Sequence, residues 1–182
     1  MNYELLNIGD QAPDFSLPNY NEEIVSLNDF KGKNIVLWFF PKANTPGWAI
    51  QGQGFREEFD DFKKLGYEII GVSGDSTKKQ TKFVEKYNFP FMMLCDESHD
   101  MLTAYKVWAL KKFMGREYMG ILRITYIIDQ DGKIAKIYDQ VKTKTHSQDV
   151  LSDCSWNMIE GRKILGAIPD CIKRLLVGNK IE

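Results

Sequence analysis

The sequence predicts an α/β domain with a mixed central sheet flanked by helices, followed by a helical C-terminal extension. Continuous apolar runs of strand length recur along the chain, as expected for strands covered on both faces. Longer segments with helical periodicity lie between these runs. The last two runs are joined by an Asp-Gly turn, which is typical of a β-hairpin. This order of elements indicates the α/β class.

Composition and charge exclude several classes of protein. The 182 residues suffice for one sizeable core, and 43% hydrophobic with 27% charged residues is ordinary for a globular domain. The net charge of −1 provides no basic field for nucleic acid or an anionic membrane. The N-terminus does not read as a secretory signal, and no apolar run approaches the ~20 residues that span a bilayer. We therefore expect a cytoplasmic protein without nucleic-acid or membrane partners.

Strands and helices are expected to alternate through the first two thirds of the chain. Two short strands flank a polar turn at 19–23, and the apolar run NIVLWFF at 34–40 is a buried strand that Pro41 ends. The next elements, in order, are a helix at about 47–65, a strand at 67–74, a helix beginning at Ser76 or Thr77, a strand at 89–96 and a short helix through Leu102 and Tyr105.

The remaining third is expected to contain a hairpin and a helical tail. Two strands, 121–129 and 133–139, meet at an Asp-Gly turn. Apolar positions at helical spacing predict two tail helices, separated by a break at Gly166 and Pro169. We divide the chain into a domain at 1–151 and an extension at 152–182, which packs on the same domain or on a partner.

One strand–loop–helix turn has the geometry of a small-anion site. The strand ends at Pro41, the chain runs through KANTPG, and a helix opens at Trp48. A helix start directs unpaired backbone N–H groups and the positive end of the helix dipole at the loop, where Thr45 adds a hydroxyl. Arg123, expected within a later strand, is costly to bury unless it meets an anion or other acceptors. The pattern alone leaves open an ordinary turn with an arginine that reaches solvent or pairs with an acid.

Five segments together resemble the peroxiredoxins, most closely the PrxQ or bacterioferritin comigratory protein type. They are GDQAPDFSLPN, VSLNDFKGKNIVLWFFPKANTPG, GFREEFDDFKKLGYEIIGVSGDS, KFVEKYNFPFMMLCDES and ILRITYIIDQDGKI, between about Gly9 and Leu151. Pro41 and Thr45 fit the family motif Pro-x-x-x-Thr/Ser-x-x-Cys, and Arg123 matches the family's active-site arginine. The resemblance implies a thioredoxin-like fold.

The resemblance also implies a reaction, the thiol-dependent reduction of hydrogen peroxide and organic hydroperoxides. A cysteine at the helix start becomes a sulfenic acid, a second thiol resolves it to a disulfide, and a thioredoxin-like reductant restores both. The helix start and Arg123 would lower the thiol pKa, while the Thr45 hydroxyl and backbone N–H groups would orient the peroxide. Neither a cofactor nor a metal is expected. Relatives of this type are implied to be monomers, although the tail could create a dimer interface.

The sequence departs from this pattern at both thiols. Trp48 occupies the position of the peroxidatic cysteine, and Gln53 occupies the position of the resolving cysteine. An indole has no ionisable nucleophile near neutral pH, so it forms neither a sulfenic acid nor a disulfide. We therefore expect a peroxidase scaffold that is catalytically silenced. The alternative is a non-catalytic binding or interaction module derived from a peroxiredoxin.

Trp48 itself has two interpretations. It is either a hydrophobic packing residue or an indole too large for a pocket built for a thiol, and overpacking of that kind costs ~1–3 kcal/mol. In the second case it fills the pocket or swings outward and frays the first helical turn. The loss of both thiols has two explanations as well, a deliberate redox-silencing substitution or natural divergence, and the sequence does not choose between them.

The other cysteines and both histidines are expected to be structural. Cys95 lies in an apolar strand and Cys154 and Cys171 on apolar faces of the tail, where thiols usually pack as small hydrophobes. A disulfide between Cys154 and Cys171 is sterically conceivable. His99 and His146 lie in polar segments and are expected at the surface rather than as ligands or bases.

Overall fold

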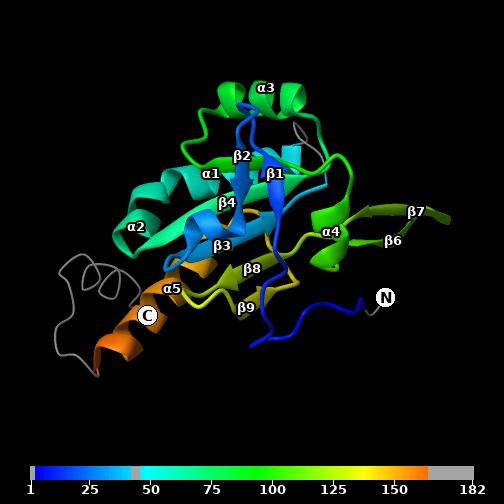
Figure 1. The fold of residues 1–182 in the computed structure, drawn as a ribbon. Coiled ribbons are helices and arrows are strands. Elements are labelled where there is room, and N and C mark those ends of the chain that lie inside the picture. The colour runs from blue at the N-terminus through cyan, green and yellow to red at the C-terminus, as the bar shows by residue number, and fades with distance from the viewer. Residues whose placement is uncertain (1–2, 42–45, 164–182) are drawn as a thin grey trace, which may run out of the picture.

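The chain folds around a five-stranded sheet with the strand order β5-β4-β3-β8-β9 (Figure 1). The computed structural model describes residues 3–41 and 46–163, with the backbone alone for 46–48, 113 and 157–163. The strands are β3 (Asn34–Phe39), β4 (Tyr67–Ser73), β5 (Met92–Cys95), β8 (Thr125–Ile128) and β9 (Ile134–Tyr138). β3, β4 and β5 run parallel, whereas β8 is antiparallel to both β3 and β9. The predicted mixed α/β sheet is confirmed.

Helices and two small strand pairs surround this sheet. The helices are α1 (Pro46–Glu57), α2 (Phe59–Lys64), α3 (Thr77–Tyr87), α4 (Asp100–Ala104), α5 (His146–Lys163) and the 3-10 turn η1 (Leu27–Phe30). The strand pairs are β1 (Ser16–Pro18) with β2 (Ile24–Ser26), and β6 (Trp108–Phe113) with β7 (Arg116–Ile121). In Figure 1 the β6–β7 hairpin projects from the side of the domain.

Strand β3 supplies side chains to two separate cores. Side chains alternate along a strand, so Val36 and Trp38 enter one core while Leu37 and Phe39 enter the other. The first core packs β3 against apolar residues of α1, α2, α3 and α5. The second packs it against α4 and the N-terminal segment. Every residue from Ile35 to Phe40 is at most 1% exposed, which explains why this strand reads as a continuous apolar run.

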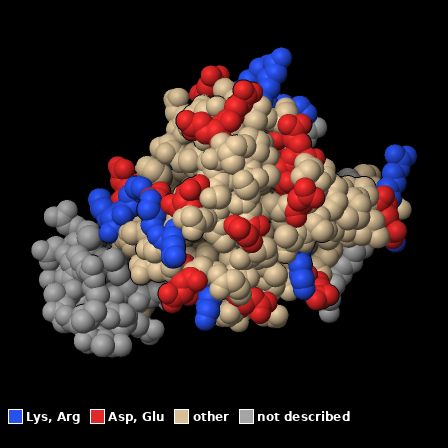
Figure 2. All heavy atoms as spheres, in the orientation of Figure 1, with Lys and Arg blue, Asp and Glu red and all other residues tan. Residues whose placement is uncertain are grey.

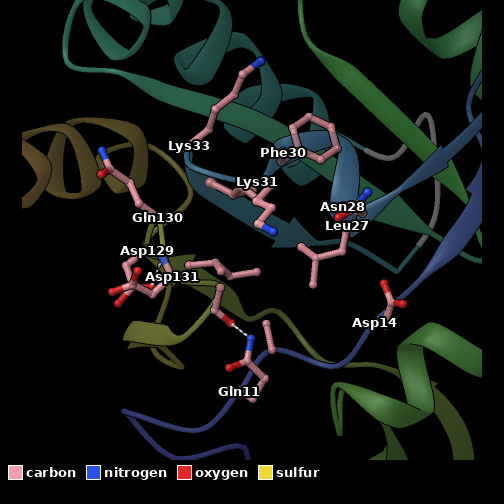
Figure 3. Close-up of a pocket in the computed structure, with 14 residues that line it drawn as sticks. Gln11, Asp14, Leu27, Asn28, Phe30, Lys31, Lys33, Asp129, Gln130 and Asp131 are labelled. Atoms are coloured by element: carbon pink, nitrogen blue, oxygen red, sulfur yellow. Dashed lines mark hydrogen bonds between the residues drawn. The ribbon is translucent and has the colours of Figure 1, made fainter.

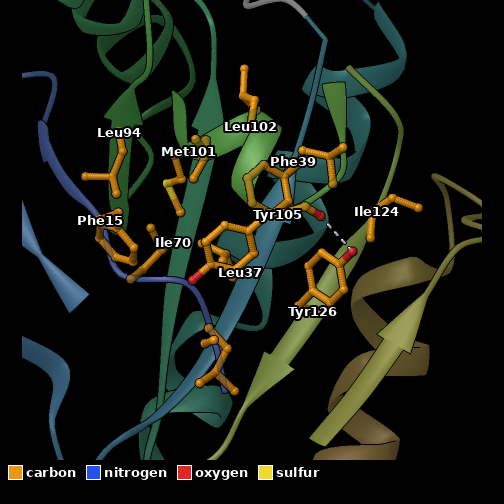
Figure 4. Close-up of a cluster of buried hydrophobic side chains, with 14 of the residues drawn as sticks. Phe15, Leu37, Phe39, Ile70, Leu94, Met101, Leu102, Tyr105, Ile124 and Tyr126 are labelled. Carbon is orange, nitrogen blue, oxygen red and sulfur yellow. Dashed lines mark hydrogen bonds between the residues drawn. The ribbon is translucent and has the colours of Figure 1, made fainter. Parts of the chain in front are cut away.

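The second core contains two buried tyrosines whose hydroxyl groups are satisfied (Figure 4). The Tyr126 hydroxyl donates a hydrogen bond to the backbone oxygen of Tyr105 at 3.0 Å. The Tyr105 hydroxyl donates to the backbone oxygen of Pro13 at 2.8 Å. A buried phenol needs such a partner, and here the partners tie the N-terminal segment to α4 and β8.

The structure corrects three details of the sequence prediction. The helix expected at 47–65 is divided at Glu58 (φ −101°, ψ 7°) into α1 and α2. Arg123 does not lie within a strand, because β8 begins only at Thr125 and residues 122–124 connect β7 to β8. The β6–β7 hairpin was not predicted, although its turn at Met114 and Gly115, with φ of 50° and 78°, follows the rule that two-residue hairpin turns need positive φ.

The tail helix is only partly within the described residues. α5 runs continuously across residue 151, and Val150, Leu151 and Cys154 pack in the first core. The Asp153 carboxylate accepts hydrogen bonds from Tyr138 at 2.6 Å and from Lys136 at 2.5 Å, which holds α5 against β9. The second predicted tail helix lies outside the described residues, and the domain boundary at 151 stays a prediction. Across 3–41 and 46–163, no helix is long and apolar enough to cross a membrane.

We predict that Gly71→Ala destabilises the domain by ~1–3 kcal/mol, measured by urea unfolding. A Cβ on Gly71 in the middle of β4 would lie 2.5 Å from the Met93 sulfur and 3.0 Å from the buried Trp38 ring. Met93→Ala in the same background should recover part of that loss. Additive effects of the two substitutions would contradict this steric explanation.

Candidate functional site

The predicted site residues gather at one end of the sheet. Trp38 near the end of β3 pairs with Thr125 at the start of β8, and Thr125 also pairs with Tyr138 at the end of β9. Pro41 follows β3 at this end and is half-buried. Arg123 lies two residues before Thr125 and is also half-buried. The structure thus brings Pro41 and Arg123 to the same end of the sheet.

Trp48 and Gln53, the predicted positions of the two family thiols, both lie on α1. Trp48 is in the first turn, the place expected for a helix-start nucleophile, and Gln53 is half-buried. Five residues of α-helix rise about 7.5 Å, which exceeds the usual Cα separation of a disulfide. Cysteines at both positions could therefore bond only if α1 opened locally. Thr45 and the Trp48 side chain lie outside the described residues, so their predicted roles stay predictions.

Gln51 is a polar residue at this site that the sequence reasoning missed. It lies three positions after Trp48 on α1 and is 1% exposed. Neither atom of its amide has a hydrogen-bond partner among the described residues. A buried unpaired polar group typically costs ~1–3 kcal/mol, so Gln51 is a candidate for polar interaction near the start of α1. The helical spacing of Trp48, Gln51 and Phe55 on one face was a signal that could have identified it.

Arg123 lines a pocket together with a second cation, Lys111 of β6. The pocket has a volume of about 510 Å³, and its walls are Tyr3, Leu5, Lys111, Leu122, Arg123, Ile124, Asp139 and Gln140. Burial lowers the pKa of Arg123. Burial, and then the charge of Arg123, lower the pKa of Lys111. This end of the sheet is therefore a half-buried positive region, as an anion site requires.

His146 is not at the surface, so the sequence prediction for it is wrong. Its ring is 2% exposed and its Nε2 lies 2.9 Å from the Thr125 hydroxyl. Phe55 and Tyr138 contact the ring edge-on. Burial is the main cause that lowers its pKa to about 4; Asp149 opposes this shift and Arg123 adds to it. His146 thus links the start of α5 to α1, β8 and β9, while the half-buried His99 stacks on Trp108.

The described cysteines are packing residues, as predicted. Cys95 and Cys154 are both buried and both free. Burial is the largest cause that raises the pKa of each thiol to about 12, so neither forms the thiolate that redox chemistry needs near neutral pH. Cys171, and with it the conceivable disulfide to Cys154, lies outside the described residues.

Another pocket, of about 470 Å³, lies at the opposite end of the sheet (Figure 3). It adjoins the paired residues Ile35 and Ile128, and the Gln11 side chain closes one side through a 2.9 Å hydrogen bond to the backbone oxygen of Gly132. Its charged lining is mixed, with Asp14, Lys31, Lys33, Asp129 and Asp131. None of the predicted site residues lines it.

The charge distribution agrees with the composition. Figure 2 shows acidic and basic side chains interspersed on one face of the molecule. Among the residues that the structure describes, that face shows no continuous basic surface of the kind that marks nucleic-acid binding.

Comparison with known proteins is consistent with this geometry. Residues 8–137 match the AhpC/TSA family. The chain is 46% identical to Peroxiredoxin Bcp of Bacillus subtilis, over 80% of this chain and 93% of the relative. It is 44% identical to Peroxiredoxin Bcp of Escherichia coli, over 81% and 94%. A cysteine-to-serine mutant of Xylella fastidiosa PrxQ superposes with a TM-score of 0.80 at 28% identity, covering 85% of this chain and 98% of that one. Xanthomonas campestris peroxiredoxin Q has a TM-score of 0.75 at 28% identity, covering 79% and 91%.

We predict that His146 makes stability depend on pH between 6.5 and 4. Its folded pKa is about 4 against an ordinary value of 6.5, so the unfolded chain takes up the proton first as the pH falls. The stabilisation is present above pH 6.5 and is lost towards pH 4, by about 3 kcal/mol in total.

Urea unfolding of the wild type and of His146→Gln at several pH values measures this effect. The glutamine variant lacks the titrating ring, so the difference in unfolding free energy between the two proteins should shrink as the pH falls. A difference that stays constant across this range would contradict the prediction.

Proposed function

This chain belongs to the AhpC/TSA family of peroxiredoxins, and from that premise we propose that it is a PrxQ-type scaffold whose cysteine-based peroxidase cycle is silenced. One observation carries the proposal: the first turn of α1 contains Trp48 where the family motif has its cysteine. In the family reaction the thiolate attacks the peroxide, an S–O bond forms, the O–O bond breaks and the departing oxygen takes a proton. The indole of Trp48 offers no electron pair for that step.

The two cysteines of the described chain are not expected to replace the missing thiol. Cys95 ends β5 and Cys154 lies within α5, and burial raises the pKa of each to about 12. A thiol with such a pKa is almost wholly protonated at neutral pH, and the thiolate is the nucleophile in this chemistry. This supports loss of turnover rather than its transfer to another residue of the described chain.

The rest of the site fits a peroxidase scaffold. Pro41 and the start of α1 still follow β3, and Arg123 is half-buried at the same end of the sheet. In an active relative, a helix start and an arginine would stabilise a thiolate and the developing charge on oxygen. In this chain the same groups could hold an anion without any bond being broken.

A second candidate function is a binding module, which the pocket at Lys111 and Arg123 favours. Both cations line one pocket of about 510 Å³ and are half-buried. This arrangement could bind an anion whether or not a thiol is present. We place either function in the cytosol, where cysteines such as Cys95 and Cys154 remain reduced.

The proposal predicts no peroxide consumption by the wild type above buffer, with dithiothreitol or thioredoxin as reductant. Trp48→Cys should restore turnover, because it places a thiol in the first turn of α1, where the family motif has its cysteine. Adding Gln53→Cys should make the activity responsive to thioredoxin, since a disulfide then forms. Hydrogen peroxide and an organic hydroperoxide should both be tested as substrates.

Trp48→Ser is the matched control, because it removes the indole and supplies a hydroxyl in place of a thiol. It should stay inactive. Wild-type turnover that persists in Trp48→Ser would overturn the silencing proposal and direct attention to Cys95. A folded double cysteine variant without activity would favour the binding module over a silenced peroxidase.

A further inference from the structure

The pocket at Arg123 is built from four separate segments of the chain. β6 contributes Lys111, and the link from β7 to β8 contributes Arg123 and two apolar neighbours. The N-terminal segment contributes Tyr3 and Leu5, and the residues after β9 contribute Asp139 and Gln140. Its volume of about 510 Å³ is within the range of roughly 300–1,000 Å³ that is usual for small-molecule sites.

Lys111 is held in place by the hairpin itself. Its aliphatic stem lies across Gly120 on the neighbouring strand, so that a Cβ on Gly120 would be 3.1 Å from Lys111 Cδ. Its ammonium group donates a hydrogen bond to the backbone oxygen of Ile121 at 3.2 Å. In the described part of the chain Lys111 forms no ion pair. The glycine thus allows the lysine to lie over the strand towards Arg123.

The charges in the pocket favour one negative group. Lys111 and Arg123 are both half-buried and close enough to repel each other, which contributes to the lowered pKa of Lys111. Asp139 lines the same pocket and carries the opposite charge. A ligand with a single negative charge could meet the two cations and avoid Asp139, whereas a dianion would meet Asp139 as a like charge.

We propose that this pocket binds a small organic monocarboxylate, with its carboxylate between Lys111 and Arg123. The planar guanidinium accommodates two carboxylate oxygens, and the ammonium adds a third donor. The apolar part of the ligand lies against Leu5 and the ring of Tyr3, which line the pocket on the N-terminal side. This inference rests on the second candidate function, the binding module, and adds the chemical class of its ligand.

Lys112 provides a matched control on the same hairpin. Consecutive strand residues point to opposite faces, and Lys112 is exposed, 3.9 Å from Glu117, and not part of the pocket. Removing Lys112 changes the net charge by the same amount as removing Lys111. A difference between the two substitutions therefore reports on the pocket rather than on overall charge.

Isothermal titration calorimetry with benzoate, benzamide and inorganic phosphate tests the proposal on the full chain. Benzoate should bind, and its neutral isostere benzamide should not. Lys111→Met should weaken benzoate binding by about tenfold or more, while Lys112→Met stays within about twofold of the wild type. Lys111→Gln keeps a hydrogen-bond donor towards Ile121 and should also bind benzoate more weakly. It tests the proposal independently if the methionine variant does not fold.

Three outcomes would overturn the proposal: equal affinity for benzoate and benzamide, equal effects of the Lys111 and Lys112 substitutions, or tighter binding of phosphate than of benzoate. The titrations contain no peroxide, so they are independent of catalysis. Peroxide turnover by the wild type would refute the silenced cycle and leave carboxylate binding intact. Absence of binding with an inactive wild type would refute only the ligand assignment.

Discussion

Burial of β3 on both faces is the constraint on which the rest of the structure depends. The strand pairs with β4 on one side and β8 on the other, and its side chains alternate between two apolar cores. Helices must cover one face and α4 with the N-terminal segment the other, because an exposed apolar face would be unstable. The carboxyl end of β3 then delivers the chain to Pro41 and the start of α1, so the location of the site follows from the core.

A second set of contacts makes the tail helix part of the same end of the sheet. His146 opens α5, lies 2.9 Å from the Thr125 hydroxyl, and contacts the rings of Phe55 and Tyr138. These partners belong to β8, α1 and β9, the elements that surround the candidate site. A neutral ring suits this position, because a charged imidazolium would be buried near Arg123. The first turns of α5 therefore have a structural role.

The candidate site combines a positive, half-buried region with a helix start that carries Trp48 instead of a cysteine. Arg123 and Lys111 still create a positive, half-buried region beside the sheet. Peroxide reduction needs that region and a sulfur together, whereas anion recognition needs the region alone. Keeping two cations half-buried costs the same free energy in either case, so the proposed binding role is compatible with a site that has no cysteine at position 48 or 53.

The sequence by itself determined the chain order of the five central strands, the apolar character of β3, and the absence of sulfur at Trp48 and Gln53. These depend on local periodicity and on covalent identity, which need no knowledge of distant neighbours. Tertiary structure alone decided that His146 is buried and that Lys111 faces Arg123. Both depend on segments that are far apart in the chain, so burial and electrostatic surroundings are set by packing that no local pattern encodes.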